Sequence, residues 1–168
     1  MKRLILFIAI VGIFSAVAFA QNKKADKEAA AKAQFDKAVA AIDAKDFVII
    51  VDTYESSDRT IVTNTDASNF ISYEKEFAFL QGMIVADNNY TNKLNVSDYK
   101  QVVDKKGNIK VEMEVKGTYV NAKIEISLKK GGNYADIIIS PNKGNAKRFS
   151  GELIPRAESK YFKRSGEV

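Results

Sequence analysis

The sequence predicts an α+β domain in which one N-terminal amphipathic helix packs on a mostly antiparallel β-sheet. Three observations point to this fold class. Apolar residues recur with a helical period before residue 45, short β-type runs follow in series from residue 46, and strict alternation appears after residue 108. The sheet is expected to be a meander, either open or curled into a half-barrel.

The helix is expected over residues 22–45, a stretch rich in Ala and Lys that contains no Gly or Pro. Its apolar residues recur at three- and four-residue spacing, with lysines on the outer face. They form a narrow stripe: Ala31, Phe35, Ala38, Val39 and Ile42. A membrane-surface helix usually carries a bulkier apolar face than this, so we expect the stripe to dock on the sheet.

The strands are expected between residues 46 and 155. Phe47–Val51 is a continuous apolar run, typical of a strand that is buried on both faces. Three shorter runs follow, each separated from the next by polar residues: Thr60–Thr63, Asn69–Tyr73 and Glu76–Leu80. Residues 86–97 are rich in Asn and are expected to form a long loop or an irregular edge.

The hairpin at Gly131-Gly132 can be placed in register from its turn. Two consecutive glycines are a two-residue hairpin signal between alternating strands. This turn puts every apolar side chain on one face through three pairs: Leu128 with Ala135, Ile126 with Ile137, and Ile124 with Ile139.

The register of the preceding hairpin is inferred from charge. A four-residue loop over 116–119 sets Glu112 opposite Lys123 and Lys110 opposite Glu125, whereas a two-residue loop sets Lys110 opposite Lys123. Opposite charges on facing strands stabilise a sheet by about 0.2–1 kcal/mol, and like charges destabilise it. The longer loop is therefore expected.

The first twenty residues have the pattern of a secretory signal. Lys2 and Arg3 precede an apolar stretch that ends in Ala18-Phe19-Ala20, a small-x-small cleavage site. The seventeen positions from Leu4 to Ala20 are marginal for a membrane span, which needs about 20 apolar residues. We expect cleavage after Ala20 and release as a soluble periplasmic or extracellular protein. A lipid anchor on a cleavage-site cysteine is excluded because the chain has no Cys.

The expected organisation is therefore a signal peptide over 1–20, a single domain over 21–155, and a basic, flexible tail over 156–168. The domain is long enough to bury about 68–70% of its unfolded surface without disulfides. The formal net charge of the whole chain is +5, and Lys2 and Arg3 supply two of its positive charges. The remaining basicity is mild, so nucleic acid is not an expected partner.

Missing residue types restrict the chemistry. The chain contains no His and no Cys, which removes Ser-His-Asp and Cys-His hydrolases, thiolate zinc sites and redox thiols. Glu112 and Glu114 share a strand face, but lysines surround them and they are expected to be solvated. Asp87–Asn92 offers oxygen ligands but lacks the glycine and the distal glutamate of a calcium loop. We expect no catalytic residues, no metal and no cofactor.

Candidate binding residues fall into two groups. Tyrosines, which often contact sugars or partner proteins, lie in or beside predicted loops: Tyr90, Tyr99, Tyr119 and Tyr134. The tail is basic around Tyr161-Phe162 and carries Arg156, Lys160, Lys163 and Arg164, which could contact anionic lipid or polysaccharide. The alternatives are that the tyrosines close hairpin ends and that the tail is disordered.

Four segments carry a family resemblance: Phe47-Val48-Ile49 after the helix, Asn69-Phe70-Ile71, Phe79-Leu80-Gln81-Gly82, and Arg148–Pro155. With the signal peptide, they resemble a family of small exported Bacteroidetes proteins that is catalogued only as a domain of unknown function. The resemblance implies a Gram-negative periplasm or outer surface and a helix with an antiparallel sheet. It implies no catalytic residues.

The leading hypothesis is a non-enzymatic periplasmic or cell-envelope domain that binds a protein, polysaccharide or lipid component through one end or the open face of its sheet. The alternative is a carrier of an apolar or amphiphilic ligand in a half-barrel cavity, and an enzyme ranks third. A filled core capped by the helix favours the first hypothesis. An apolar cavity of several hundred Å³ favours the second. The oligomeric state is left open.

Overall fold

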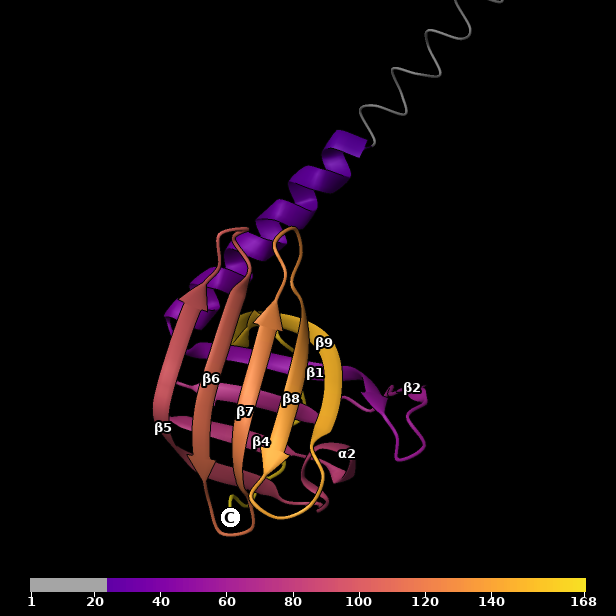
Figure 1. Cartoon of the computed structure of the whole chain (residues 1–168), viewed down its shortest axis with the longest axis vertical. Coiled ribbons are helices and arrows are strands. Elements are labelled where there is room, and N and C mark those ends of the chain that lie inside the picture. The colour runs from indigo at the N-terminus through magenta and orange to yellow at the C-terminus, as the bar shows by residue number, and fades with distance from the viewer. Residues whose placement is uncertain (1–23) are drawn as a thin grey trace, which may run out of the picture.

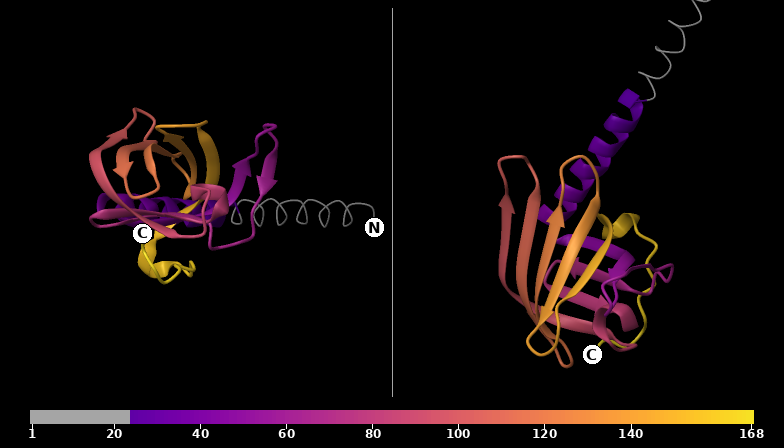
Figure 2. Two further views of the ribbon diagram at one scale, coloured as in Figure 1. Left: turned by 90° about the horizontal axis from the view of Figure 1, so that it is seen from below. Right: turned by 45° about the vertical axis from the view of Figure 1, so that its right-hand side comes forward.

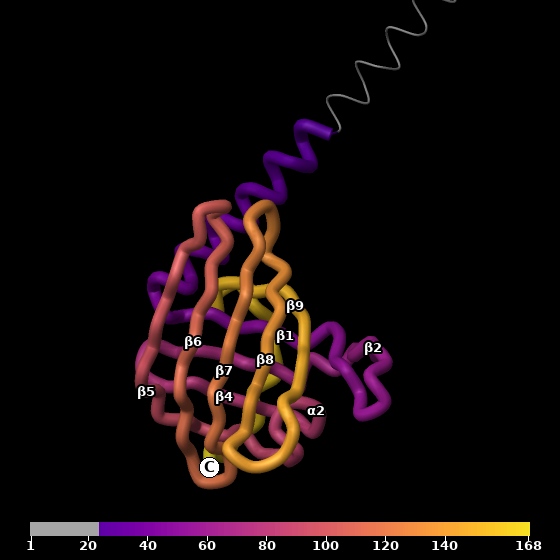
Figure 3. Tube along the Cα trace, in the orientation of Figure 1, coloured from indigo at the N-terminus to yellow at the C-terminus, as the bar shows by residue number. Residues whose placement is uncertain are grey.

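The computed structural model describes residues 24–168, so the predicted signal over 1–20 lies outside the described residues. The described part contains a nine-stranded antiparallel sheet in the order β2-β1-β3-β4-β5-β6-β7-β8-β9, with a further pairing between β1 and β9. That pairing joins the sheet to itself. Eight strands form a closed barrel, and β2 projects beside it in a hairpin with the end of β1 (Figures 1 and 3). The expectation of an open sheet or a half-barrel was wrong.

The elements follow the expected chain order, with a helix over residues 24–43 before the strands. The strands are β1 (Asp46–Glu55), β2 (Ile61–Thr63), β3 (Phe70–Glu74), β4 (Phe77–Gln81), β5 (Thr91–Val103), β6 (Ile109–Lys116), β7 (Asn121–Leu128), β8 (Tyr134–Pro141) and β9 (Lys147–Pro155). A one-turn helix, α2 (Met83–Ala86), connects β4 to β5, and a 3-10 turn, η1 (Arg156–Glu158), follows β9.

Closure of the barrel depends on β1, which pairs along both of its edges. One edge pairs with β3 through residues 46–50 and with β2 through residues 53–55, while the other edge pairs with β9 over residues 47–54. Gly151 of β9 lies opposite Val51. The carbonyl oxygen of Ile50 occupies the space where a side chain at position 151 would begin. A residue without a Cβ is therefore required where the two strands meet.

The barrel interior is filled by side chains from every strand of its wall. Buried residues of β6 and β7 alternate with exposed or half-buried ones, as the sequence pattern predicted. Eight-stranded barrels are narrow enough for side chains to fill them, and this one holds a single apolar cluster. Its largest fully buried members include Phe47, Ile49, Leu80, Leu94, Met113, Ile124, Ile126 and Ile137.

The helix docks on the barrel through the predicted stripe. Ala38 and Ile42 are fully buried in the same cluster as the barrel interior, and Phe35 and Val39 are partly buried against it. The N-terminal half of the helix projects away from the barrel (Figures 1 and 2). No helix among residues 24–168 is long and apolar enough to cross a membrane.

The register predicted from the glycine turn is confirmed. Leu128 pairs with Ala135, Ile126 with Ile137 and Ile124 with Ile139. All six side chains lie in the core cluster. The alternation of apolar residues on both strands was therefore enough to fix this hairpin.

The register predicted from charge is wrong by one pair of residues. The loop has four residues, as expected, but it spans 117–120 instead of 116–119, which places Glu112 directly opposite Glu125. The repulsion between them is relieved diagonally, because Lys110 and Lys123 each lie 2.7–3.2 Å from both carboxylates. Hydrogen bonds from the two lysines lower the pKa of Glu112 to about 2. The charge argument considered only facing pairs, whereas the long lysine side chains reach the diagonal positions.

We expect Gly151→Ala to destabilise the protein by about 3 kcal/mol or more, because the new methyl group would overlap the Ile50 carbonyl where the barrel closes. Urea unfolding followed by circular dichroism measures this change. Gly132→Ala is the matched control, since a Cβ there meets nothing within 4 Å, and it should change stability by less than about 0.5 kcal/mol. Equal losses in both variants would contradict the steric requirement for glycine at position 151.

Candidate functional site

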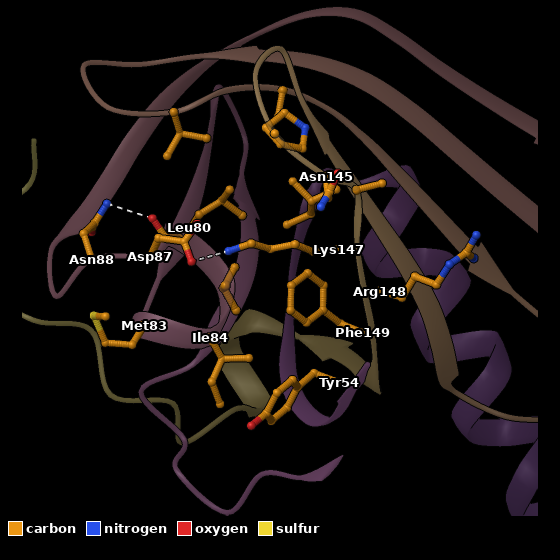
Figure 4. Close-up of a pocket in the computed structure, with 18 of the residues that line it drawn as sticks. Tyr54, Leu80, Met83, Ile84, Asp87, Asn88, Asn145, Lys147, Arg148 and Phe149 are labelled. Carbon is orange, nitrogen blue, oxygen red and sulfur yellow. Dashed lines mark hydrogen bonds and ion pairs between the residues drawn. The ribbon is translucent and has the colours of Figure 1, made fainter. Parts of the chain in front are cut away.

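The two ends of the barrel differ. The helix occupies the end at which β1 begins, and Gln101 of β5 donates a hydrogen bond of 2.7 Å to Asp43 near the helix terminus. At the opposite end, the β6–β7 and β8–β9 loops face α2 across a recess of about 1570 Å³ (Figure 4). Its floor includes Leu80, Ile139 and Phe149, which belong to the barrel core. The recess therefore reaches down to the apolar interior.

One wall of the recess is α2, which Asn69 holds in place. Gly82 precedes this helix with φ +100°, and the side chain of Asn69 fills the space that a Cβ at Gly82 would need. The Asn69 Oδ1 atom accepts a hydrogen bond of 3.2 Å from the backbone N–H of Ile84. Ile84 also lines the recess, so this contact fixes part of its apolar wall.

Asparagines also shape the corner between α2 and β5. Asn92 is buried and donates hydrogen bonds of 3.0 Å to the Leu80 carbonyl and to Oδ1 of Asn88, whose own amide bonds to the Ala86 carbonyl. The expectation of a long loop or an irregular edge over 86–97 was wrong, because β5 begins at Thr91 and pairs with both β4 and β6. The asparagine amides donate hydrogen bonds to backbone carbonyls at this turn, and β5 begins directly after it.

Two contacts join this corner to the other side of the recess. Asp87, which ends α2, forms an ion pair of 2.6 Å with Lys147 at the start of β9 (Figure 4). Tyr90 stacks on Tyr119 of the β6–β7 loop, with ring centroids 5.8 Å apart. Both contacts link segments that are distant in sequence, and they connect the wall formed by α2 to the loops opposite.

The charges that line the recess are predominantly basic. Four basic side chains, Arg59, Lys143, Lys147 and Arg148, accompany only two acidic ones, Asp87 and Glu55. Both acidic groups are already paired, because Glu55 lies 3.7 Å from Arg148. In Figure 4, Lys147 points across the recess and Arg148 points away from it. The electrostatic potential at this end therefore favours anions.

The structure brings two of the four candidate tyrosines together. Tyr90 and Tyr119 line the recess. Tyr99 packs elsewhere, against Tyr73 at 5.5 Å and beneath the ammonium group of Lys45, and burial raises the pKa of its hydroxyl to about 12. Tyr134 is exposed at the start of β8, opposite Glu152. Tyr99 and Tyr134 therefore lie outside the recess.

The basic residues of the tail are largely engaged within the molecule. Arg156 lies 2.6 Å from Asp46, and Lys163 lies 3.1 Å from Glu74 and 3.4 Å from the centre of the Phe79 ring. Arg164 donates to Ser68 and, through its backbone N–H, to Gln81. Lys160 is exposed. Residues 156–168 thus pack on the barrel, where the sequence suggested a flexible tail.

The reason for this packing is an apolar patch on the outer face of the barrel. Val48, Phe70 and Phe79 are buried there, although they point away from the core, and Tyr161 covers them. Its ring meets that of Phe70 edge-on, with centroids 4.7 Å apart. Strands β3 and β4 are apolar on both faces, which was the available sequence signal that something covers their outer side.

Sequence reasoning missed Ile84, Lys147 and Phe149 as parts of a site, and it considered Asp87 only as a calcium ligand. Each is an ordinary residue type in its own segment. Only the closed barrel brings them together at one end.

The chain matches the family model described as "Domain of unknown function (DUF4251)" over residues 29–153. A solved structure, that of a DUF4251 family protein from Bacteroides eggerthii DSM 20697, is 28% identical and superposes with a TM-score of 0.69. The match covers 79% of this chain and 94% of that one. No curated protein matches the chain. The resemblance drawn from the sequence is confirmed.

Replacing Tyr161 with Ala should destabilise the protein by about 2 kcal/mol, because the outer patch around Phe70 and Phe79 would lose its aromatic cover. Thermal and urea unfolding measure this loss. Phe162→Ala is the matched control, since the Phe162 side chain is 62% exposed, and it should stay within about 0.5 kcal/mol of the wild type. If the two variants unfold alike, the tail is not part of the folded domain.

Proposed function

This chain belongs to the DUF4251 family, and we propose that it is a non-enzymatic binding domain of the cell envelope that holds its ligand in the recess at the open end of the barrel. The observation that carries the proposal is the recess itself. A concave, largely apolar site with a few polar groups is the usual form of a ligand site, and this recess combines a floor of core residues with a charged rim.

The filled interior supports binding at the end of the barrel rather than deep inside it. The apolar cluster occupies the barrel between the helix and the recess, and the helix caps its far end. A ligand would therefore lie against the more exposed lining residues Tyr54, Met83 and Ile84, above the buried core, and would leave the core packing unchanged.

A binding role fits the chemistry of the chain better than catalysis. With no His and no Cys, a catalyst would have to use carboxylates or a lysine. The two carboxylates that line the recess are already ion-paired with Lys147 and Arg148. Each of the two carboxylates therefore already has a cationic partner, and neither is held free to contact a substrate.

Export to the envelope is supported by the first twenty residues, whose basic start, apolar stretch and Ala18-Phe19-Ala20 site have the form of a cleavable signal. The partner would then be an envelope component, and the soluble mature chain would begin at Gln21.

A second candidate function is carriage of an apolar or amphiphilic ligand between sites in the envelope. The apolar floor favours it, because the recess opens onto the barrel core. A carrier differs from a fixed receptor in that it keeps its ligand through purification.

We expect the recess to bind the neutral fluorescent probe N-phenyl-1-naphthylamine, and Ile84→Lys to weaken this binding at least tenfold, because the variant places an ammonium group in the apolar wall. Fluorescence titration gives the dissociation constants. Val102→Lys is the matched control: Val102 is a partly exposed apolar residue of β5 that does not line the recess, and its replacement should leave probe binding unchanged. Equal weakening in both variants, or no binding by the wild type, would refute the site.

Mass spectrometry of the protein purified from its native envelope tests export and carriage together. The denatured chain should have the mass of residues 21–168, because cleavage is expected after Ala20. An intact Met1 would refute cleavage. Under native conditions a carrier should show an added lipid mass, whereas a bare chain would argue against carriage and leave the binding proposal standing.

A further inference from the structure

We propose that the recess takes a single-chain amphiphile with a carboxylate head group, and that this carboxylate replaces Asp87 as the partner of Lys147. The inference rests on the proposed function, because it names the class of ligand for the same recess. It follows from the ion pair that spans the recess and from the apolar surface around it.

Lys147 is positioned to receive an anion inside the recess. Its backbone belongs to β9, and its side chain points across the recess to Asp87 (Figure 4). The Lys147 side chain is only 28% exposed, so its ammonium group depends on a close anionic partner more than a surface lysine does. In the structure that partner is a carboxylate oxygen of Asp87, 2.6 Å away. The head group of a ligand that replaces it is therefore expected to be a carboxylate as well.

Asp87 is the replaceable member of the pair. Its side chain is 76% exposed, and it lies in a left-handed turn with φ +57° at the end of α2. An ion pair with one such exposed member contributes about 0–1 kcal/mol. An incoming carboxylate can therefore take the place of Asp87 at little cost, and Asp87 returns to water.

The rest of the recess selects an amphiphile with one negative end. Tyr54, Met83 and Ile84 offer accessible apolar surface in the same recess as Lys147, where a hydrocarbon chain can lie. The basic excess at the rim attracts anions and opposes an alkylamine. An uncharged alcohol of the same length would gain the apolar contacts without the ion pair.

The test compares three probes of equal chain length, dodecanoate, dodecanol and dodecylamine, as competitors of N-phenyl-1-naphthylamine below their aggregation concentrations. Wild-type protein purified in its exported form should bind dodecanoate about tenfold more tightly than dodecanol, and dodecylamine most weakly. Asp87→Asn should tighten dodecanoate binding several-fold, because the competing carboxylate is gone, and should leave dodecanol unchanged. Asparagine is also well suited to the left-handed turn, so the variant should fold.

Lys147→Met should reduce dodecanoate binding to the level of dodecanol, while unchanged dodecanol binding shows that the recess is intact. The matched control for charge is Asp136→Asn, which also removes the carboxylate of an exposed ion pair, that with Lys129, but lies outside the recess lining. It should change dodecanoate binding less than twofold.

The outcomes separate the two proposals. If dodecanoate and dodecanol bind wild-type protein equally, or if Asp87→Asn fails to tighten dodecanoate, the carboxylate proposal is wrong and the recess remains a ligand site. If no probe binds the wild type at all, the proposed function itself fails.

Discussion

The pairing of β1 with β9 is the constraint on which the rest of the structure depends. β1 uses one edge for β3 and the other for β9, and the two backbones approach closely where Gly151 offers no side chain. Because the wall closes on itself, the inward residues of its strands meet in one core. A closed wall also means that the interior is reached through the ends of the barrel. The ends are therefore where this fold can place a site.

Chain order explains why only one end is filled. Just two residues, Ala44 and Lys45, separate the helix from β1, so the helix must pack where β1 begins. The other end of β1 carries Tyr54 and Glu55, which line the recess. Among residues 24–168, that end is bordered by α2, by connecting loops and, near β5, by C-terminal residues such as Val168. The long helix fills the other end, and the recess lies at the end that it does not reach.

The periodicity of apolar residues correctly predicted the features that depend on one segment or on two adjacent segments. The stripe through Ala38 and Ile42 and the β7–β8 register follow from periodicity within one or two adjacent segments, and both are present. Closure could not be predicted in this way, because Phe47 pairs with Pro155 across most of the chain. The β6–β7 register failed for a different reason. Facing charges seemed decisive, but Lys110 and Lys123 reach diagonal carboxylates and remove the penalty for opposing Glu112 to Glu125.

The residues of the recess could not be predicted from local patterns either. The partners of the basic residues also distinguish cations that are available to a ligand from cations that are not. The lysines of the tail were candidate binding residues because they cluster in the sequence. Lys163, however, is paired with Glu74, whose side chain is only 16% exposed, and lies over the Phe79 ring. Displacing that partner would require unpacking the outer face. Lys147 has an ordinary place in the sequence, but its partner Asp87 faces water. A cation can bind a ligand only if its present partner can leave, and on that criterion we propose the recess, rather than the basic tail, as the surface that binds an anion.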